Sequence, residues 1–240
     1  MVEIADGEAL CGVWTGTAGE AHLLFRDAAG HTRETTTVFE PFVWAADTPA
    51  GLDAGACRET RLSGDVPLNR LIRFSDMDAY FGLIRDRSNP VPLEYIRVLD
   101  NQLLLTRQLR LFGDFHFSQI RRAQVDIETA CEVEGGFSDP GRKGDRVLAV
   151  GVRMGDDVRL LEIEAMTDRA ERELLQAFGR LVREWDPDVI EGHNLFNFDL
   201  YYLNKRGRRF RLSPDWGRFG RKASFRSSRI RIAERWVDFS

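Results

Sequence analysis

An acidic pair within an alternating stretch is the feature that most constrains the fold of this chain. In residues 124–129 (QVDIET), Asp126 and Glu128 flank Ile127, and Val125 precedes them. Side chains alternate between the two faces of a strand, so the acids would share one face while Val125 and Ile127 enter the core. Neighbouring like charges repel each other, and burying them without a partner is costly. Two interpretations follow: a divalent cation lies between the carboxylates, or the stretch is an edge strand with a solvated face.

The composition indicates a soluble globular protein of one large domain or two ordinary ones. The chain has 240 residues, of which 43% are hydrophobic and 30% charged. It contains no apolar run of the roughly 18 to 20 residues that a membrane span needs, and it begins with no basic-then-apolar signal segment. The three cysteines, Cys11, Cys57 and Cys131, are widely spaced and match no metal or redox pattern. We therefore predict free thiols in the reducing cytoplasm and no membrane partner.

The charge is distributed unevenly along the chain. The net charge of −4 argues against a dedicated nucleic-acid binder. Between Lys205 and Arg235, however, there are twelve Lys or Arg residues and only two acids, Asp215 and Glu234. Such a basic stretch indicates a polyanionic partner. The alternative is a solvated basic face or a mobile arm.

Short strands and turns dominate the first half of the chain, and strands alternate with helices in the second. We place a domain boundary near residue 120, which gives domains 1–120 and 121–240. The second domain is predicted to contain, in order, the acidic strand, a hairpin over 146–163, a helix from Thr167 or Asp168 to Trp185, a short strand over 188–192, a helix over 195–206 capped by Asn194 and ended by Gly207, and a final strand over 229–237. The predicted fold class is α/β: an α+β N-terminal domain followed by a mixed β-sheet flanked by helices.

Asp199 is the second candidate element of a site. It would lie about one and a half turns into the helix that follows Asn194. Ligands of open α/β sheets bind at strand ends near helix starts, so this acid could face Asp126 and Glu128. The alternative is an acid that only interacts with the helix dipole. Together with the acidic pair, the metal interpretation is favoured.

Three carboxylates from two elements could hold two divalent cations, and oxygen ligands favour Mg²⁺ or Mn²⁺ over zinc. Such cations could activate a water and stabilise the leaving oxygen of an in-line phosphoryl displacement. The basic stretch would supply counter-charges for a nucleic-acid backbone, and Phe198 could stack on a terminal base.

These motifs resemble those of B-family DNA polymerases. Residues 125–129 (VDIET) are similar to the first exonuclease motif of the family. Residues 192–199 (GHNLFNFD) are similar to the second motif, in which an Asn is followed four and five positions later by Phe and Asp. The segments 112–122 and 216–218 also fit the family. The resemblance covers the whole chain loosely and residues 120–240 closely.

The resemblance implies a ribonuclease-H-like 3′→5′ proofreading exonuclease domain after an N-terminal domain. Asp126 would then bridge two metal ions, Glu128 would join it at the nucleophile's metal, and Asp199 would serve the second metal, largely through water. Thr129, Asn194 and Phe198 would contact the nucleic acid. The implied partners are single-stranded or primer-template DNA and a downstream polymerase domain of the same parent chain.

One departure from the family changes the expectation for activity. The third motif of the family, a Tyr followed four residues later by a fourth carboxylate, is missing from these 240 residues, and Asp238 stands in the wrong element to replace it. We therefore expect the front portion of a longer protein, with weak nuclease activity or none. Two other classes stay open: a non-catalytic nucleic-acid-binding module, and a ribonuclease-H-like recombinase or integrase core, against which Asp199 after an Asn cap argues.

Overall fold

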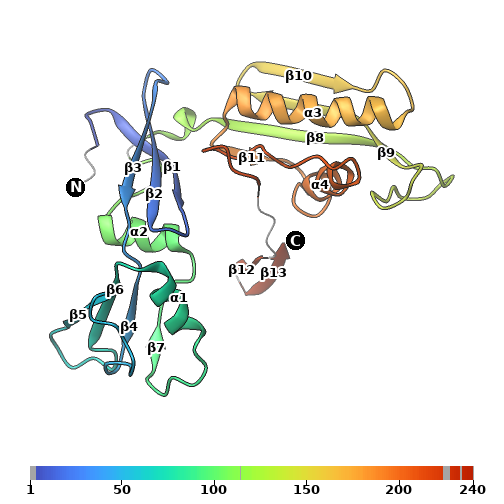
Figure 1. Ribbon diagram of the computed structural model, residues 1–240. Helices are drawn as coiled ribbons and strands as arrows, with labels where there is room; N and C mark the ends of the chain where they lie inside the picture. Colours follow the sequence, from blue (N-terminus) through green and yellow to red (C-terminus); the bar gives the residue numbers. More distant parts are fainter. Residues whose placement is uncertain (1–3, 114, 224–227, 233, 240) are drawn as a thin grey trace. The chain divides into compact units, whose positions relative to one another are not determined.

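The computed structural model describes residues 4–113, 115–223, 228–232 and 234–239. The chain divides into two units, Met1–His116 and Phe117–Ser240 (Figure 1). The division falls close to the boundary that the sequence suggests near residue 120. No helix in the described residues is long and apolar enough to cross a membrane. The three cysteines are free thiols, as predicted.

The described residues of the first unit form two antiparallel sheets and two helices. Its first sheet is a meander of β1 (Glu8–Thr15), β2 (Glu20–Asp27) and β3 (Thr32–Val38). Its second sheet has the order β5-β6-β4-β7, with β4 at Phe42–Ala45, β5 at Cys57–Arg61, β6 at Arg70–Phe74 and β7 at Leu93–Glu94. Helix α1 spans Met77–Arg85, and α2 spans Leu99–Arg107.

A buried glutamine joins the parts of the first unit. The Gln102 side chain in α2 accepts a hydrogen bond from the Phe42 backbone N–H at 2.8 Å. Its amide group donates to the Tyr80 hydroxyl at 2.9 Å and to the Ile96 carbonyl at 2.7 Å. Because buried polar groups need partners, this side chain fixes α2 against both β4 and α1.

The second unit is built on a four-stranded mixed sheet of order β10-β9-β8-β11. Its strands are β8 (Arg122–Ala130), β9 (Arg146–Met154), β10 (Asp157–Glu162) and β11 (Val189–Glu191). β8, β9 and β10 pair antiparallel, whereas β11 pairs parallel to β8. The hairpin and the mixed sheet are therefore confirmed.

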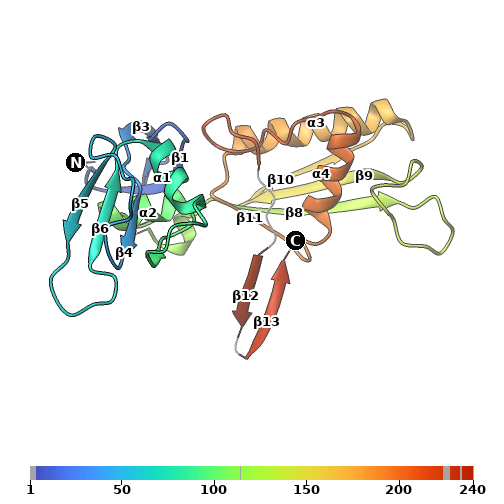
Figure 2. The same ribbon diagram turned by 60° about the horizontal axis from the view of Figure 1, so that its bottom comes forward.

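Two helices of the second unit share one apolar core with the sheet. α3 (Asp168–Trp185) is capped by the Thr167 side chain, which accepts from the Ala170 N–H at 3.2 Å. In Figures 1 and 2, α3 runs along the strands, and α4 (Asp199–Arg209) crosses them steeply in Figure 2. Apolar residues of both helices and of β8 and β9 form a single buried cluster. The other face of the sheet carries exposed side chains.

The helix predicted over residues 195–206 is wrong at both ends, because the observed helix α4 spans Asp199–Arg209. Asn194 has φ 53°, in the left-handed region, instead of the extended backbone of an N-cap residue. The carbonyl of Asn194 accepts from the Phe198 N–H at 2.9 Å, so residues 194–198 form turns before the helix begins. The helix then passes through Gly207, because a glycine within a helix weakens it without necessarily ending it.

The predicted final strand is also wrong in part. Residues 229–237 do not form one strand, since β12 (Ser228–Ile232) and β13 (Arg235–Phe239) pair antiparallel with each other. The alternating pattern of this stretch fits either arrangement, because both halves of a hairpin have the same period of two.

Candidate functional site

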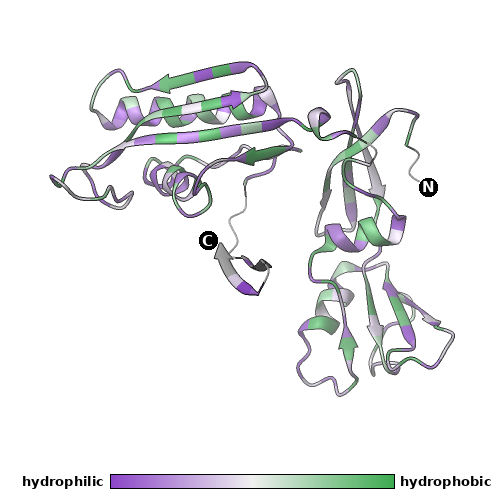
Figure 3. Cartoon of the chain, turned by 180° about the vertical axis from the view of Figure 1, so that it is seen from behind, coloured by the Kyte–Doolittle hydropathy of each residue, from purple (hydrophilic) through white to green (hydrophobic). Residues whose placement is uncertain are grey.

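The acidic pair lies on the solvent-facing side of β8. Val125 and Ile127 are buried at 2% and 6% exposure, while Asp126 and Glu128 are exposed, which is the predicted alternation. Asp126 pairs with Gly151 of β9, and Glu128 pairs with Ala149. These two partners are small, so the face around the acids stays open. Figure 3 views the sheet from behind, with hydrophilic and hydrophobic residues alternating along its strands.

Asp199 is buried directly beside this pair. It is the first residue of α4 and is only 2% exposed. Its Oδ1 accepts a hydrogen bond from the backbone N–H of Ile127 at 3.1 Å. β11 pairs with β8 only as far as Gln124, so this N–H lies beyond the end of β11. The carboxylate therefore takes the place of a strand partner, between the positions of Asp126 and Glu128.

The surroundings of Asp199 disfavour the ionised form of its carboxyl group. Burial raises the pKa of the Asp199 carboxyl, and the neighbouring charge of Asp126 raises it further. Hydrogen bonds from the backbone N–H groups of Asp199 and Ile127 and the nearby His193 act in the opposite direction, but the pKa stays above its ordinary value. A positive charge beside Asp199 would favour the ionised carboxylate and lower its pKa again.

A glycine allows the segment before α4 to approach β8 closely. A Cβ atom at Gly192 would overlap the carbonyl oxygen of Val125. Leu195, at 3% exposure, then packs into the core below the sheet. The close backbone approach and the buried leucine together position the turn that leads into Asp199.

A depression of about 690 Å³ lies beside Asp126 on the open face of the sheet. Gly192, His193, Glu191 and Arg153 are among the residues that line it. His193 is a residue that the sequence interpretation did not select, although it acts on the charge of Asp199. Its position directly before Asn194 in the second motif is the signal that could have identified it.

The three residues predicted to contact nucleic acid have different surroundings. Asn194 is exposed. Phe198 is half-buried, and its ring lies 5.5 Å from the Tyr202 ring, so much of it packs against the core. Thr129 follows a β-bulge, and its hydroxyl is 2.7 Å from that of Ser138. Of the three, Asn194 is the most accessible to a ligand.

The loop that contains Ser138 is fastened by two buried charged groups. Asp145 accepts hydrogen bonds from the backbone N–H groups of Glu132 and Asp139 at 2.7 and 2.6 Å. Arg206 of α4 donates to the carbonyls of Pro140 and Arg142 at 3.3 and 3.0 Å. These contacts hold the loop against the end of β8 at which Thr129 lies.

Arg206 also forms a buried ion pair with Glu171 of α3. The two side chains are fully buried and make two hydrogen bonds, of 2.7 and 2.5 Å. Glu171 additionally accepts from the Val147 N–H at 3.0 Å. The pair therefore joins α3, α4 and β9 to one another, and this arginine of the basic stretch is structural.

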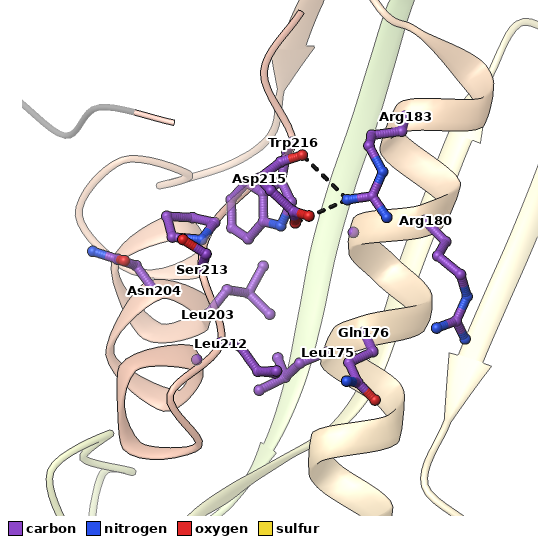
Figure 4. A pocket seen from close by; sticks show the side chains of 13 residues that line it. Leu175, Gln176, Arg180, Arg183, Leu203, Asn204, Leu212, Ser213, Asp215 and Trp216 are labelled. Atoms are coloured by element: carbon purple, nitrogen blue, oxygen red, sulfur yellow. Dashed lines mark hydrogen bonds and ion pairs between the residues drawn. The ribbon is translucent and has the colours of Figure 1, made fainter. Parts of the chain in front are cut away.

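Other arginines around the basic stretch are structural as well. Arg218 binds Asp186 and Asp188 at 2.6 Å each. Arg183 of α3 binds Asp215 at 2.8 Å, beside a hollow of about 260 Å³ between α3, α4 and residues 212–216 (Figure 4). The expectation that the basic stretch contacts a polyanion is therefore restricted to those of its cations that stay exposed.

The donor types at the acidic site suit a hard divalent cation. Asp126, Glu128 and Asp199 offer only carboxylate oxygens, the ligands that Mg²⁺ and Mn²⁺ prefer. Within the described residues, however, no group of three or more His, Cys, Asp or Glu side chains could hold a metal ion as placed. The donor set fits in kind, and the side chains of the exposed pair would have to turn toward Asp199 to complete it.

Comparisons with known proteins agree on one family. Residues 115–235 match the family described as DNA polymerase family B, exonuclease domain. The DNA polymerase of Archaeoglobus fulgidus is 26% identical over 178 residues, which cover 68% of this chain and 22% of the relative. The DNA polymerase delta catalytic subunit of Bos taurus is 33% identical over 124 residues, which cover 45% of this chain and 11% of the relative.

A solved structure shows the same fold. The family B DNA polymerase of Pyrobaculum calidifontis superposes with a TM-score of 0.63 at 17% identity, over 96% of this chain and 35% of that one. The chain thus spans about a fifth of the archaeal relative's length and about a third of the solved structure's chain. Because the family match covers more than half of its residues, this chain belongs to DNA polymerase family B and contains the exonuclease domain of that family.

Proposed function

We propose that this chain hydrolyses phosphodiester bonds from the 3′ end of DNA, as the proofreading part of a family B DNA polymerase. The observation that carries the proposal is the hydrogen bond between Asp199 and the Ile127 N–H. It brings the start of α4 to the stretch of β8 that carries Asp126 and Glu128. Three carboxylates on two neighbouring elements suit a reaction in which positive charge must be held beside a phosphate.

The residues of the site divide into anchored and exposed groups. Asp199 is held by burial and by backbone N–H groups, whereas Asp126 and Glu128 are exposed and free to turn. The three would hold Mg²⁺ or Mn²⁺. When bound, these cations would supply activation of the attacking water and stabilisation of the leaving oxygen.

The terminal nucleotide would lie between the turn before α4 and the end of β8. Asn194 is exposed and offers both a donor and an acceptor for a base or sugar. Phe198 presents only the part of its ring that the core leaves uncovered, and Thr129 shares its hydroxyl with Ser138. We expect Asn194 to contribute most of the three to nucleotide positioning.

We expect the 240-residue chain alone to work slowly. Two of its three carboxylates are exposed, so little besides the strand backbone fixes their orientation, and catalytic groups act best when neighbouring contacts hold them. The partner of this region would be the polymerase domain of the same parent chain.

Degradation of labelled single-stranded DNA tests the proposal. The chain should shorten a 5′-labelled oligonucleotide stepwise with Mg²⁺ or Mn²⁺, and a chelator should stop it. Asp126→Asn with Glu128→Gln should lower the rate at least about 100-fold, since even outer-shell partners of metal sites contribute about 10- to 100-fold.

A matched control uses two exposed acids of the same sheet. Asp157→Asn with Glu162→Gln on β10 removes the same charge away from the site and should leave the rate unchanged. Equal losses in both double variants, or release of internal fragments instead of mononucleotides, would refute the proposed activity.

A non-catalytic nucleic-acid-binding module is the second candidate. It is favoured by the finding that no metal-binding group is formed by the described carboxylates as they lie. In that case DNA binding would be salt-sensitive but unaffected by chelator and by Asp126→Ala, and no degradation would follow.

A further inference from the structure

Strand β10 forms one edge of the sheet in the second unit. Among the described strands it pairs with β9 alone, and it stands at the end of the order β10-β9-β8-β11 (Figure 1). In an antiparallel pair, alternate residues direct their backbone groups toward the partner. The Ile163 N–H donates to the Leu148 carbonyl beside β9 at 2.9 Å. By alternation, the backbone groups of Val158, Leu160 and Glu162 point away from β9, to the free edge.

This free edge carries exposed apolar side chains. Val158 and Leu160 are 60% and 61% exposed. Leu160 pairs with Gly151, whose lack of a side chain leaves the leucine open on that flank. The Arg159 guanidinium donates to the Val158 carbonyl at 3.2 Å, in agreement with the outward direction of that carbonyl. Natural proteins usually protect such edges, because unpaired backbone groups beside apolar side chains attract another strand.

A groove of about 340 Å³ lies beside this edge, between β10 and α3. Leu161 and Leu174 are among the residues that line it, and α3 contributes the small residues Ala170 and Ala177. Successive side chains of a strand point to opposite faces. Every second side chain of a strand added to β10 would therefore enter the groove, and the others would lie on the open face of the sheet.

The charge around the edge is negative. Residues 156–164 (DDVRLLEIE) contain four acids and one cation. None of these four acids has an ion pair within the described part of the chain, whereas Glu173 across the groove pairs with Arg169. The residues that line the groove include Glu162, Glu164 and Glu173 but a single cation, Arg180. A segment with Lys or Arg side chains would complement this charge.

We propose that β10 binds an extended, basic segment of a partner protein as an added strand. Backbone hydrogen bonds to Val158, Leu160 and Glu162 would hold the segment, and its apolar side chains would fill the groove. In this mode of recognition, the main chain supplies affinity and the side-chain pockets supply specificity. The surface contains none of the carboxylates assigned to DNA hydrolysis, so this inference goes beyond the proposed function and does not depend on it.

The test is binding of a short fluorescein-labelled peptide of alternating valine and lysine by this chain in chelator, with hydrogen exchange of the backbone followed by NMR. The peptide should slow exchange of the Leu160 and Glu162 N–H groups at least about tenfold. The Arg159 and Leu161 N–H groups, which face β9, should be protected before the peptide is added. A peptide with glutamate in place of lysine should not bind.

Substitutions separate the contributions of backbone and groove. Leu160→Pro removes an outward N–H, and proline is tolerated at such positions of edge strands. It should weaken peptide binding at least about tenfold, and Leu160→Thr, which keeps the N–H, should weaken it less. Ala177→Leu fills the groove and should weaken binding at least about fivefold. Unfolding temperatures should show that each variant folds.

The charge is tested by Asp156→Asn with Glu164→Gln, which should weaken binding about fivefold at low salt. The matched control, Asp65→Asn with Glu94→Gln on exposed positions of the first unit, removes the same charge and should change the affinity less than about twofold.

Two results would overturn the proposal. The first is peptide binding that is unchanged in Leu160→Pro, or that slows exchange elsewhere than in β10. The second is a Leu160 N–H that exchanges slowly without peptide while light scattering detects dimers, because the edge would then pair with a second copy of this chain.

Discussion

The carboxylate of Asp199 hydrogen-bonds the backbone N–H of Ile127, the residue between Asp126 and Glu128, at 3.1 Å. One bond thus relates the first residue of α4 to the two acids of β8. The geometry of the site depends on how closely the turn over residues 192–198 approaches the strand. The same dependence makes the site sensitive to changes that touch none of its carboxylates.

Gly192→Ala should displace this turn. The added Cβ would overlap the Val125 carbonyl oxygen, which is backbone and cannot rotate away. We expect a loss of stability of about 1–3 kcal/mol, as for other overpacked sites. We also expect a loss of up to about 100-fold in the rate of DNA degradation, because small misplacements of catalytic groups have large effects. Urea unfolding and degradation assays measure the two.

Gly151→Ala is the control for this substitution. Gly151 lies opposite Asp126 on β9, and a Cβ there would meet only the Asp126 carbonyl oxygen at an ordinary 3.9 Å. Stability and activity should both persist. If Gly192→Ala behaved like Gly151→Ala, the close approach would have no functional importance.

Magnesium should stabilise the folded chain if the three carboxylates bind it. A cation at about 100 times its dissociation constant adds about 2.7 kcal/mol to the free energy of unfolding. Asp126→Asn with Glu128→Gln should abolish the rise in unfolding temperature on adding Mg²⁺ or Mn²⁺, while Asp157→Asn with Glu162→Gln should retain it. A rise of equal size in both variants would locate the cation elsewhere.

Removal of one partner from the buried ion pair should be strongly destabilising. Glu171→Met leaves the Arg206 guanidinium in the core without its ion-pair partner, with the Pro140 and Arg142 carbonyls as hydrogen-bond acceptors. Breaking a buried pair in this way costs about 3–5 kcal/mol. The double variant with Arg206→Met should recover much of the loss, since buried pairs can often be replaced by apolar residues. A double-mutant cycle from denaturant unfolding measures this; strictly additive losses would contradict the pairing.

The stability contributed by Asp145 should depend on pH. Burial opposes its charge, but the Glu132 and Asp139 backbone N–H groups and the Arg142 and Arg206 guanidinium groups lower its pKa below the ordinary 3.8. A lowered pKa means that the stabilisation is complete above the unfolded value and is lost as the pH falls through the folded one. Asp145→Asn should therefore cost about 2 kcal/mol or more at pH 7.

The difference in unfolding free energy between wild type and Asp145→Asn should shrink as the pH is lowered below the ordinary carboxyl range. Comparing the two proteins at each pH cancels the other titrating groups. A difference that is constant with pH would mean that the aspartate acts by shape and not by charge.

The sequence was most informative where structure follows from a local period. The alternation around Asp126 and Glu128 predicts their shared exposed face, and the 3.6-residue period predicts α3 almost to its ends. The start of α4 could not be predicted in this way. Asn194 is a residue type that often caps helices, but its backbone here is left-handed. This conformation occurs next to the close approach of Gly192 to Val125, which depends on tertiary packing.

The separate roles of the cations in the basic stretch could not be predicted for a related reason. Charge runs are usually solvated, yet Arg206 is fully buried because its partner Glu171 comes from α3, far away in sequence. Its spacing from Tyr202 and Leu203 is the helical spacing of the buried face, and this was the available signal. Lys205 and Arg208 stay exposed on α4. They can be told apart from the arginines with structural roles only in the folded chain.

The short β11 has a consequence for the pairing of the whole sheet. Because β11 ends opposite Gln124, the Ile127 N–H beyond that end is bound by a side chain, that of Asp199, instead of by a strand. A slip of β8 by one residue would turn Val125 and Ile127 toward water and the two acids toward the core. It would also move the Ile127 N–H out of reach of Asp199. The Asp199 carboxylate, which we assign to the chemistry, therefore also disfavours a sheet in which β8 has the wrong register. Correct strand pairing and assembly of the acidic site are thus coupled.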